Sequence, residues 1–201
     1  MSLVALASGG LDSTVMAVMA KEEGLKQYPL FIDYGQRAAA REWSACRAVF
    51  RRHGLPKPIR MDLSGFGARV PSGLTSTRLD VLADAFLPAR NLLFLLAGAA
   101  YASRVGASAV AIGLLDERQR LFDDQSRRFL KQAESLLRVA TATSVSIVAP
   151  LIKTSKRQVL ELARQRGVRG TYSCHAGTKR PCGACLSCKE RAAAEGGKRG
   201  R

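Results

Sequence analysis

Short apolar runs alternate along the chain with stretches in which apolar residues recur every three or four positions. The short runs are typical of strands, and they fall at 3–7, 28–35, 57–64, 107–115 and 144–149. The periodic stretches are typical of helices, and they fall at 13–23, 37–53, 87–104, 122–140 and 156–166. Residues 64–85 show neither pattern, and we expect a loop or lid there.

Strands that alternate with helices at this spacing predict an α/β fold with an open, mostly parallel sheet and helices on both of its faces. Ligands of such sheets bind beyond the carboxyl ends of the strands, where the strand order reverses. The chain has 201 residues, which suits one main domain. We expect that domain over 1–170, a small cysteine-containing segment over 171–191 and a disordered basic tail over 192–201.

Composition narrows the class of protein without assigning a function. The hydrophobic content is 47%, and no apolar stretch long enough to cross a bilayer is free of charge, so we expect a globular protein with no membrane span. The first residues enter a strand and lack the features of a secretory leader, which favours a cytoplasmic location. The net charge of +16 suits either attraction to polyanions or a solvated basic surface, and composition does not separate the two.

The stretch ASGGLDST at 7–14 follows the first predicted strand and opens the first predicted helix. Its small residues leave backbone N–H groups accessible, and such groups at a helix N-terminus favour an anion such as pyrophosphate. Ser8, Ser13 and Thr14 add hydroxyl donors, and Asp12 can hold a magnesium ion against the phosphates. A glycine-rich turn with a helix cap is the structural alternative, but the full pattern S-G-G-x-D-S-T favours phosphate binding.

Four cysteines near the end of the sequence form the pattern C-x7-C-x2-C-x2-C, made by Cys174, Cys182, Cys185 and Cys188. Four thiolates at this spacing suit a tetrahedral zinc site, and because they fill the coordination shell the metal would be structural. An iron–sulfur cluster or a redox pair is the alternative, since disulfides are not expected in the cytoplasm.

Two other residues of reactive type are given no role by the sequence. Cys46 falls in the apolar stripe of the second predicted helix, together with Trp43, Val49 and Phe50, and is interpreted as a core residue. His175 follows a predicted metal ligand, but four cysteines already suffice, so it is interpreted as a bystander.

The loop resembles that of the PP-loop ATP pyrophosphatases, which split ATP between the α and β phosphates. Together with the cysteine pattern, it is similar to the 7-cyano-7-deazaguanine synthase (QueC/ExsB-like) family. Four further stretches carry this resemblance: DYGQR at 33–37, LPARNLLFLLAGAAYA at 87–102, AIG at 111–113 and APL at 149–151. The resemblance implies an adenine nucleotide alpha hydrolase-like fold, with ATP, Mg²⁺ and Zn²⁺ as cofactors.

The family's activity implies a ligase that adenylates the carboxylate of 7-carboxy-7-deazaguanine with ATP. Ammonia then displaces AMP to give the amide, and a second ATP activates the amide oxygen so that loss of AMP leaves the nitrile. No side-chain nucleophile is needed, and catalysis rests on positioning and electrostatics.

Matching positions imply the site residues. Those implied to bind the nucleotide are Ala7, Ser8, Gly9, Gly10, Leu11, Asp12, Ser13, Thr14, Val15, Met16, Ala17, Asp33, Gln36 and Asn91. Asp12 and Ser13 are also expected to act in catalysis, together with Arg90. A cation is unfavourable at the start of a helix, which supports a ligand role for Arg90 over that of a plain surface charge.

The substrate segment departs from the family pattern. Where the family has a segment like S-G-Y-P-D-C-R, this chain has LFDDQSRRFL at 121–130, which keeps only Phe122 and Asp124 in place. The resemblance implies that these two residues read the deazaguanine, Phe122 as an apolar plate and Asp124 as an acceptor. The structural alternative is that Phe122 is a core residue at a helix start and Asp124 caps that helix.

Other functions stay open at this point. One is a divergent relative that joins an adenylated deazaguanine acid to another amine or to a macromolecule. Another is a tRNA-modifying PP-loop enzyme, which the positive charge favours and the lack of an added RNA-binding domain disfavours. A nucleic-acid-binding zinc module is disfavoured because basic and aromatic residues are not interleaved. A homodimer is possible by analogy with the family.

Overall fold

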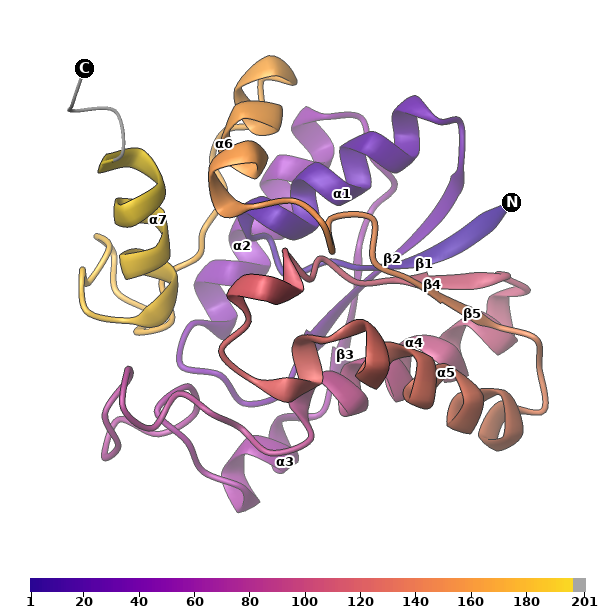
Figure 1. Cartoon of the computed structure of the whole chain (residues 1–201), viewed down its shortest axis with the longest axis horizontal. Coiled ribbons are helices and arrows are strands. Elements are labelled where there is room, and N and C mark those ends of the chain that lie inside the picture. Colours follow the sequence, from indigo (N-terminus) through magenta and orange to yellow (C-terminus); the bar gives the residue numbers. More distant parts are fainter. Residues whose placement is uncertain (197–201) are drawn as a thin grey trace.

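A computed structural model of the chain describes residues 1–196 (Figure 1). Its centre is a sheet of five parallel strands in the order β3-β2-β1-β4-β5. The strands are β1 (Ser2–Leu6), β2 (Lys26–Asp33), β3 (Ile59–Asp62), β4 (Ala109–Ala111) and β5 (Ser146–Val148). The strand order reverses between β1 and β4, so the loops that follow these two strands flank the expected ligand position.

Helices cover both faces of the sheet (Figure 1). One face carries α1 (Leu11–Glu22), α2 (Ala39–Arg52) and α6 (Lys156–Gln165), and the other carries α4 (Arg90–Val105) and α5 (Arg127–Thr141). Short helices lie in the connections: α3 (Ser64–Arg69), η1 (Glu117–Gln119) and η2 (Asp123–Gln125). The last helix is α7 (Leu186–Gly196), which packs against α6.

Successive residues of β1 point to opposite faces and so build two separate cores. Leu3 and Ala5 pack with α1, α2 and α6, whereas Val4 and Leu6 pack with α4 and α5. Leu3, Val4 and Ala5 are almost fully buried, so both faces of β1 are covered, as expected for a central parallel strand.

The structure confirms the α/β class, the parallel sheet and the place of every predicted strand. The helix predicted over 122–140 begins only at Arg127, because the Ser126 hydroxyl accepts from the Phe129 N–H and caps α5 there. The strand predicted over 107–115 pairs only from Ala109 to Ala111. Residues 64–69, expected in a loop, form the short helix α3.

Residues 192–196, expected to belong to a disordered tail, are helical, because α7 extends to Gly196. Alanine is the strongest helix former, and Arg191 and Glu195 form an ion pair of 2.9 Å one turn apart, which supports a helix in AAAEG. The remainder of that expected tail lies outside the described residues. Among residues 1–196 no helix is both long and apolar enough for a transmembrane span.

Candidate active site

A cavity of about 240 Å³ lies at the carboxyl end of β1, where the strand order reverses. Its floor is apolar, with side chains from β1 and β2 and Phe94 of α4. Its polar wall contains the loop after β1, residues at the start of α4 and a part of the cysteine segment. An apolar floor beside a polar rim suits a nucleotide, whose base needs packing and whose phosphates need donors.

The loop after β1 owes its shape to two adjacent glycines with different tasks. Gly9 has φ +76° and lies against α2, where an added Cβ would sit 2.5 Å from the Glu42 carbonyl oxygen. Gly10 has an ordinary extended backbone and lines the cavity. The Ser8 hydroxyl accepts from the Gly10 N–H at 3.2 Å and lies 3.0 Å from the Ser13 hydroxyl. Glycine at both positions therefore lets the loop press against α2 and keep its inner face bare.

Asp12, in the first turn of α1, is paired with a cation from the far end of the chain. Both of its carboxylate oxygens accept from the Lys156 ammonium at 2.8 Å. Lys156 is the first residue of α6, and its side chain is only 12% exposed. The Ser155 hydroxyl accepts from the Gln158 N–H and starts α6 at this residue, as predicted. The Asp12 carboxylate, which lines the cavity, is thus paired with an ammonium that lines an adjoining cavity.

A cation that does line the cavity lies at the start of α4. Arg90 and the buried Asn91 both line the cavity, and the Arg90 guanidinium lies 5.9 Å from the centre of the Phe94 ring. Ala89, just before them, has φ +60°, a left-handed conformation that strains any residue with a Cβ. This turn precedes the first residue of α4 and so fixes the placement of Arg90.

Burial shifts the pKa values of titratable side chains that line the cavity. Burial raises the pKa of Glu42 to about 7, although the Gln36 amide donates to its carboxylate at 3.0 Å. Burial likewise raises the pKa of Tyr34 to about 12. Glu42, Gln36 and Tyr34 all line the cavity, whereas the predicted nucleotide ligand Asp33 does not. Asp33 is buried and ion-paired with Arg60 of β3.

The four cysteines of the predicted metal site come together. The sulfur atoms of Cys174, Cys182, Cys185 and Cys188 all lie within 4.8 Å of one another. A tetrahedral zinc ion with bonds of about 2.3 Å holds its sulfurs about 3.8 Å apart, so this donor set fits a four-thiolate zinc site. Cys46 is remote from the cluster; it is fully buried in the core, as expected, and burial raises its pKa to about 12.

The cysteine segment also forms a wall of the cavity. The Tyr172 N–H donates to the Gly9 carbonyl oxygen at 2.9 Å, and Tyr172, Ser173 and His175 line the cavity. Burial and the charges of Arg90 and Lys156 lower the pKa of His175 to about 4, so the imidazole is neutral at pH 7. His175 is not part of the four-cysteine cluster, which agrees with its interpretation as a bystander of the metal, but it lines the cavity.

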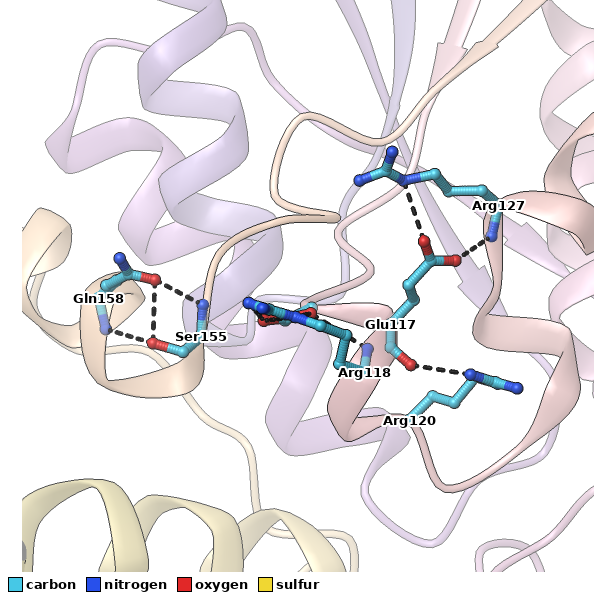
Figure 2. Close-up of polar contacts among 7 residues, drawn as sticks. Glu117, Arg118, Arg120, Arg127, Ser155 and Gln158 are labelled. Atoms are coloured by element: carbon cyan, nitrogen blue, oxygen red, sulfur yellow. Dashed lines mark hydrogen bonds and ion pairs between the residues drawn. The ribbon is translucent and has the colours of Figure 1, made fainter.

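The segment between β4 and α5 is held by a network of acids and arginines (Figure 2). The Glu117 carboxylate accepts from the Arg127 N–H at 2.8 Å and forms an ion pair with its guanidinium at 3.2 Å. Asp116 accepts from the Arg118 side chain, which lowers the pKa of that carboxyl to about 2. The Arg120 guanidinium donates to the Glu117 carbonyl oxygen at 3.1 Å. These contacts fix the path of the chain on both sides of η2.

Asp124 lies in the middle of η2 and has a buried carboxylate oxygen, Oδ1, without a hydrogen-bond partner. Burial raises its pKa, and the nearby charge of Arg90 lowers it in part. The Asn91 amide donates to the Asp124 carbonyl oxygen at 3.2 Å and so joins η2 to α4. Asp124 does not cap α5, because Ser126 does, so that structural alternative is wrong.

Phe122 lies beside an aromatic side chain that the sequence analysis did not select. Its ring centre is 5.0 Å from that of Phe86, and the two rings are tilted by 46°. Phe86 is 49% exposed, and both rings line an open groove that also contains Asp124. The groove adjoins the cavity through the start of α4, since Asn91 contacts Asp124 and lines the cavity.

The structure therefore brings most of the predicted polar site residues to the cavity. Ala7, Ser8, Gly10, Asp12, Ser13, Gln36, Arg90 and Asn91 line it. Gly9, Leu11, Thr14, Val15, Met16, Ala17 and Asp33 do not; they are buried or shape the loop from behind. Lys156 was missed, although the argument applied to Arg90, a cation at the start of a helix, applies to it equally.

A parallel α/β sheet with the S-G-G-x-D-S-T loop at its reversal point defines the class of PP-loop, ATP-using enzymes. Solved structures share the fold at low sequence identity. A U34-tRNA thiolase from Methanococcus maripaludis is 18% identical with a TM-score of 0.57, over 98% of this chain and 64% of that one. A predicted tRNA methyltransferase subunit from Methanocaldococcus jannaschii is 17% identical with a TM-score of 0.55, over 82% and 74%.

The family model described as "Queuosine biosynthesis protein QueC" matches residues 2–196, so the chain belongs to the QueC family. Curated relatives are similar over almost their whole length. The 7-cyano-7-deazaguanine synthase of Campylobacter curvus is 32% identical over 94% of this chain and 90% of its own. That of Trichodesmium erythraeum is 33% identical over 95% and 94%. The synthase from Methanothermobacter thermautotrophicus is 32% identical over 95% and 92%.

Proposed function

We propose that the protein is an ATP-dependent carbon–nitrogen ligase that converts 7-carboxy-7-deazaguanine and ammonia to 7-cyano-7-deazaguanine. The observation that supports this proposal is that two sites adjoin each other. One is the cavity that contains the loop from Ser8 to Ser13, and the other is the groove that contains Asp124 with its unpartnered oxygen. Arg90 and Asn91 lie between them, where an activated carboxylate would meet the α phosphate.

In the proposed reaction a carboxylate oxygen of the substrate attacks the α phosphorus of ATP, and the bond to pyrophosphate breaks. Bare N–H groups and the hydroxyls of Ser8 and Ser13 hold the leaving pyrophosphate, while Arg90 offsets charge that grows at the α phosphate. Ammonia then attacks the acyl carbon, loses a proton and expels AMP. The amide oxygen then attacks the α phosphorus of a second ATP in the same site and displaces pyrophosphate. Departure of AMP, with loss of both protons from the amide nitrogen, leaves the nitrile.

Two metal ions fit the donor sets of the chain. The carboxylate of Asp12, beside the serine hydroxyls of the loop, suits Mg²⁺, which prefers oxygen ligands and would neutralise phosphate charge. The four thiolates suit Zn²⁺, which would fix the fold of the cysteine segment and so the wall that carries Tyr172 and Ser173.

Recognition of the base is proposed for the groove. A deazaguanine carries an amino group and a ring N–H that need an acceptor, and Asp124 offers a buried oxygen with none of its own partners. The tilted pair of Phe86 and Phe122 offers an apolar surface for the ring. Gln125 and Ser126, which replace the family's Cys-Arg pair, are engaged locally: Gln125 accepts from the Leu121 N–H, and Ser126 caps α5.

The replacement of the family's Cys-Arg pair by Gln125 and Ser126 supports a second candidate product, because the groove lacks two side chains of the family pattern. The activated acid could be joined to another amine instead of being carried to the nitrile. Ammonia as the amine donor, a homodimer and a cytoplasmic location all stay predictions.

Product analysis tests the proposal. The protein is incubated with MgATP, ammonium and 7-carboxy-7-deazaguanine, and the products are identified by mass spectrometry, with the nitrile and AMP expected. Asp124→Ala should raise KM for the acid by about one to two orders of magnitude, because an unpaired buried donor costs about 1–3 kcal/mol, and should leave KM for ATP almost unchanged.

Asp123→Ala is the matched control, since Asp123 lies in the same short helix with a fully exposed side chain. An amide or a conjugate as the end product would favour the second candidate. AMP formation that does not depend on the deazaguanine acid would contradict both. Equal losses in the two aspartate variants would show that the base is read elsewhere.

A further inference from the structure

The polar wall of the first cavity contains an acidic side chain that the proposed reaction does not use. Glu42, in the first turn of α2, lines this cavity together with Arg90 of α4. The Gln36 amide donates to Oε2 of the Glu42 carboxylate at 3.0 Å and so orients it. Gln36 is itself held in place, because its amide oxygen accepts from the Tyr34 N–H at 2.9 Å. A carboxylate of defined orientation therefore borders the space in which the acid would be activated.

The Glu42 carboxylate differs from two other acids near the cavity because it has no cationic partner. Asp12 is paired with Lys156, and Asp33 with Arg60. Among residues 1–196, Glu42 forms no ion pair, and its side chain accepts a hydrogen bond only at Oε2. The other oxygen, Oε1, is therefore left for a ligand, and a positive charge beside it would offset the cost of burying a carboxylate.

The cavity beside Glu42 suits a small cation that can give up a proton. Tyr34 and Phe94, with ring centres 5.2 Å apart, line the same cavity, and aromatic faces attract cations. Burial raises the pKa of Glu42 to about 7. Both its charged and its neutral form are therefore accessible near neutral pH, as a group that takes up and releases a proton in each cycle requires.

The charged and titratable neighbours of Glu42 come from four parts of the chain. They are Asp33 and Tyr34 at the end of β2, Cys46 of α2, Arg90 of α4 and Tyr172 of the cysteine segment. Burial raises the pKa values of Tyr34, Cys46 and Tyr172, so these three groups stay neutral near pH 7. The charge of Arg90 lowers the pKa of Glu42, and that of Asp33 raises it.

We propose that Glu42 is a catalytic residue that binds an ammonium ion and accepts the proton whose loss makes ammonia the nucleophile. The inference rests on the proposed ligase reaction and assigns a residue to its second step. An N–H bond of ammonium breaks, the proton passes to Oε1 of Glu42, and the lone pair left on nitrogen forms the C–N bond at the acyl carbon. The C–O bond to AMP breaks with its electron pair on the phosphate oxygen. Water takes a second proton from the nitrogen, which leaves the amide, and Glu42 returns its proton to solvent.

Two half-reactions separate this role from binding of the nucleotide. Adenylation is measured without ammonium, as exchange of labelled pyrophosphate into ATP in the presence of the deazaguanine acid. Consumption of the acid is then measured over a series of ammonium concentrations. Glu42→Gln should lower kcat/KM for ammonium by about 100-fold or more, the usual contribution of a proton-transfer group, and should change the exchange rate by less than about twofold.

Hydroxylamine tests the proton transfer directly, because it is a much weaker base than ammonia and is uncharged at neutral pH. Glu42→Gln should therefore form the hydroxamate at close to the wild-type rate. Glu42→Asp, which keeps a carboxylate, should restore part of the reaction with ammonium. Glu22→Gln is the matched control, because Glu22 lies at the far end of α1 from the loop and pairs with Arg166.

Three results would overturn the inference. One is an unchanged dependence on ammonium in Glu42→Gln. Another is an equal loss of pyrophosphate exchange and of reaction with ammonium, which would assign Glu42 to the nucleotide or the acid. The third is an equal loss with ammonium and with hydroxylamine. Melting temperatures are measured for each variant, and a loss of activity that only follows unfolding would assign Glu42 a structural role instead.

The half-reactions also distinguish this inference from the proposed function. If the wild-type protein shows no exchange that depends on the deazaguanine acid, both fail. If it shows this exchange and Glu42→Gln uses ammonium as well as the wild type does, only the inference fails.

Discussion

Substitution by alanine should have different effects at the two adjacent glycines of the loop after β1: Gly9→Ala should mainly lower stability, and Gly10→Ala should mainly weaken nucleotide binding. Gly9→Ala places a methyl group 2.5 Å from the Glu42 carbonyl oxygen and 2.7 Å from the Cys46 nitrogen, both backbone atoms of α2. The left-handed backbone at φ +76° adds about 1–2 kcal/mol of strain for a residue with a Cβ. Overpacking against a rigid helix adds about 1–3 kcal/mol.

Together these terms predict that Gly9→Ala lowers the free energy of unfolding by about 2–5 kcal/mol. For a protein of this size each kcal/mol corresponds to about 2–4 °C, so the melting temperature should fall by about 4–20 °C. The methyl group of Gly10→Ala lies 3.1 Å from the Ser8 hydroxyl and in ordinary contact, at 3.6 Å, with oxygens of Tyr172 and Ser173, on an extended backbone that alanine adopts freely. Its stability should stay within about 1 kcal/mol of the wild type.

Binding of an ATP analogue should be weakened more by Gly10→Ala than by Gly9→Ala, the reverse of the order for stability. The methyl group of Gly10→Ala lies on the face of the loop that lines the cavity, so binding of a non-hydrolysable ATP analogue should weaken by at least about tenfold. Thermal unfolding followed by circular dichroism and calorimetric titration measure the two effects. A Gly9→Ala protein with wild-type stability would refute the close approach to α2, and a Gly10→Ala protein with full affinity would refute the placement of the phosphates.

Two further predictions concern the metal cluster and the floor of the cavity. Cys185→Ser should abolish retention of zinc, measured by elemental analysis, and should lower the free energy of unfolding by several kcal/mol. The reason is that structural zinc contributes about 10–16 kcal/mol of binding free energy in zinc peptides. Iron in place of zinc in the wild type would contradict this prediction. Glu42→Gln should raise the free energy of unfolding at pH 8 by about 1–3 kcal/mol and much less at pH 5. Burial raises the pKa of Glu42 in the folded protein from 4.5 to about 7, so its carboxyl group destabilises the fold increasingly as the pH rises above 4.5. Equal effects of the substitution at pH 5 and pH 8, measured by denaturant titration, would contradict this pKa shift.

Local features of the fold and site could be predicted from the sequence because their signals lie within a few residues. The loop at 7–14, the start of the last helix predicted over 156–166 and the cysteine cluster each depend on contacts between near neighbours in the sequence. The predicted start of α5 was wrong because Phe122 fits the apolar spacing of that helix, whereas the Ser126 cap starts the helix later, at Arg127.

What could not be predicted depends on contacts between distant residues. Lys156 meets Asp12 across 144 positions, and Phe86 meets Phe122 from a stretch without any pattern. Asp33 is the last residue of β2, where a nucleotide ligand would lie, but Arg60 on the neighbouring strand forms an ion pair with its carboxylate.

The position of β1 in the sheet has a consequence for synthesis on the ribosome. β1 is synthesised before its second neighbour β4, whose Ala109 pairs with Leu3. Until β4 emerges, the nascent segment with β1, β2 and β3 has an apolar strand edge with unpaired backbone groups, a form prone to association with other chains. The cavity beside the loop is also incomplete at that stage, because Tyr172, which lines it, and Lys156, which pairs with Asp12, both follow β4 in the sequence. Protection of that edge therefore has to wait for synthesis of the segment that contains β4.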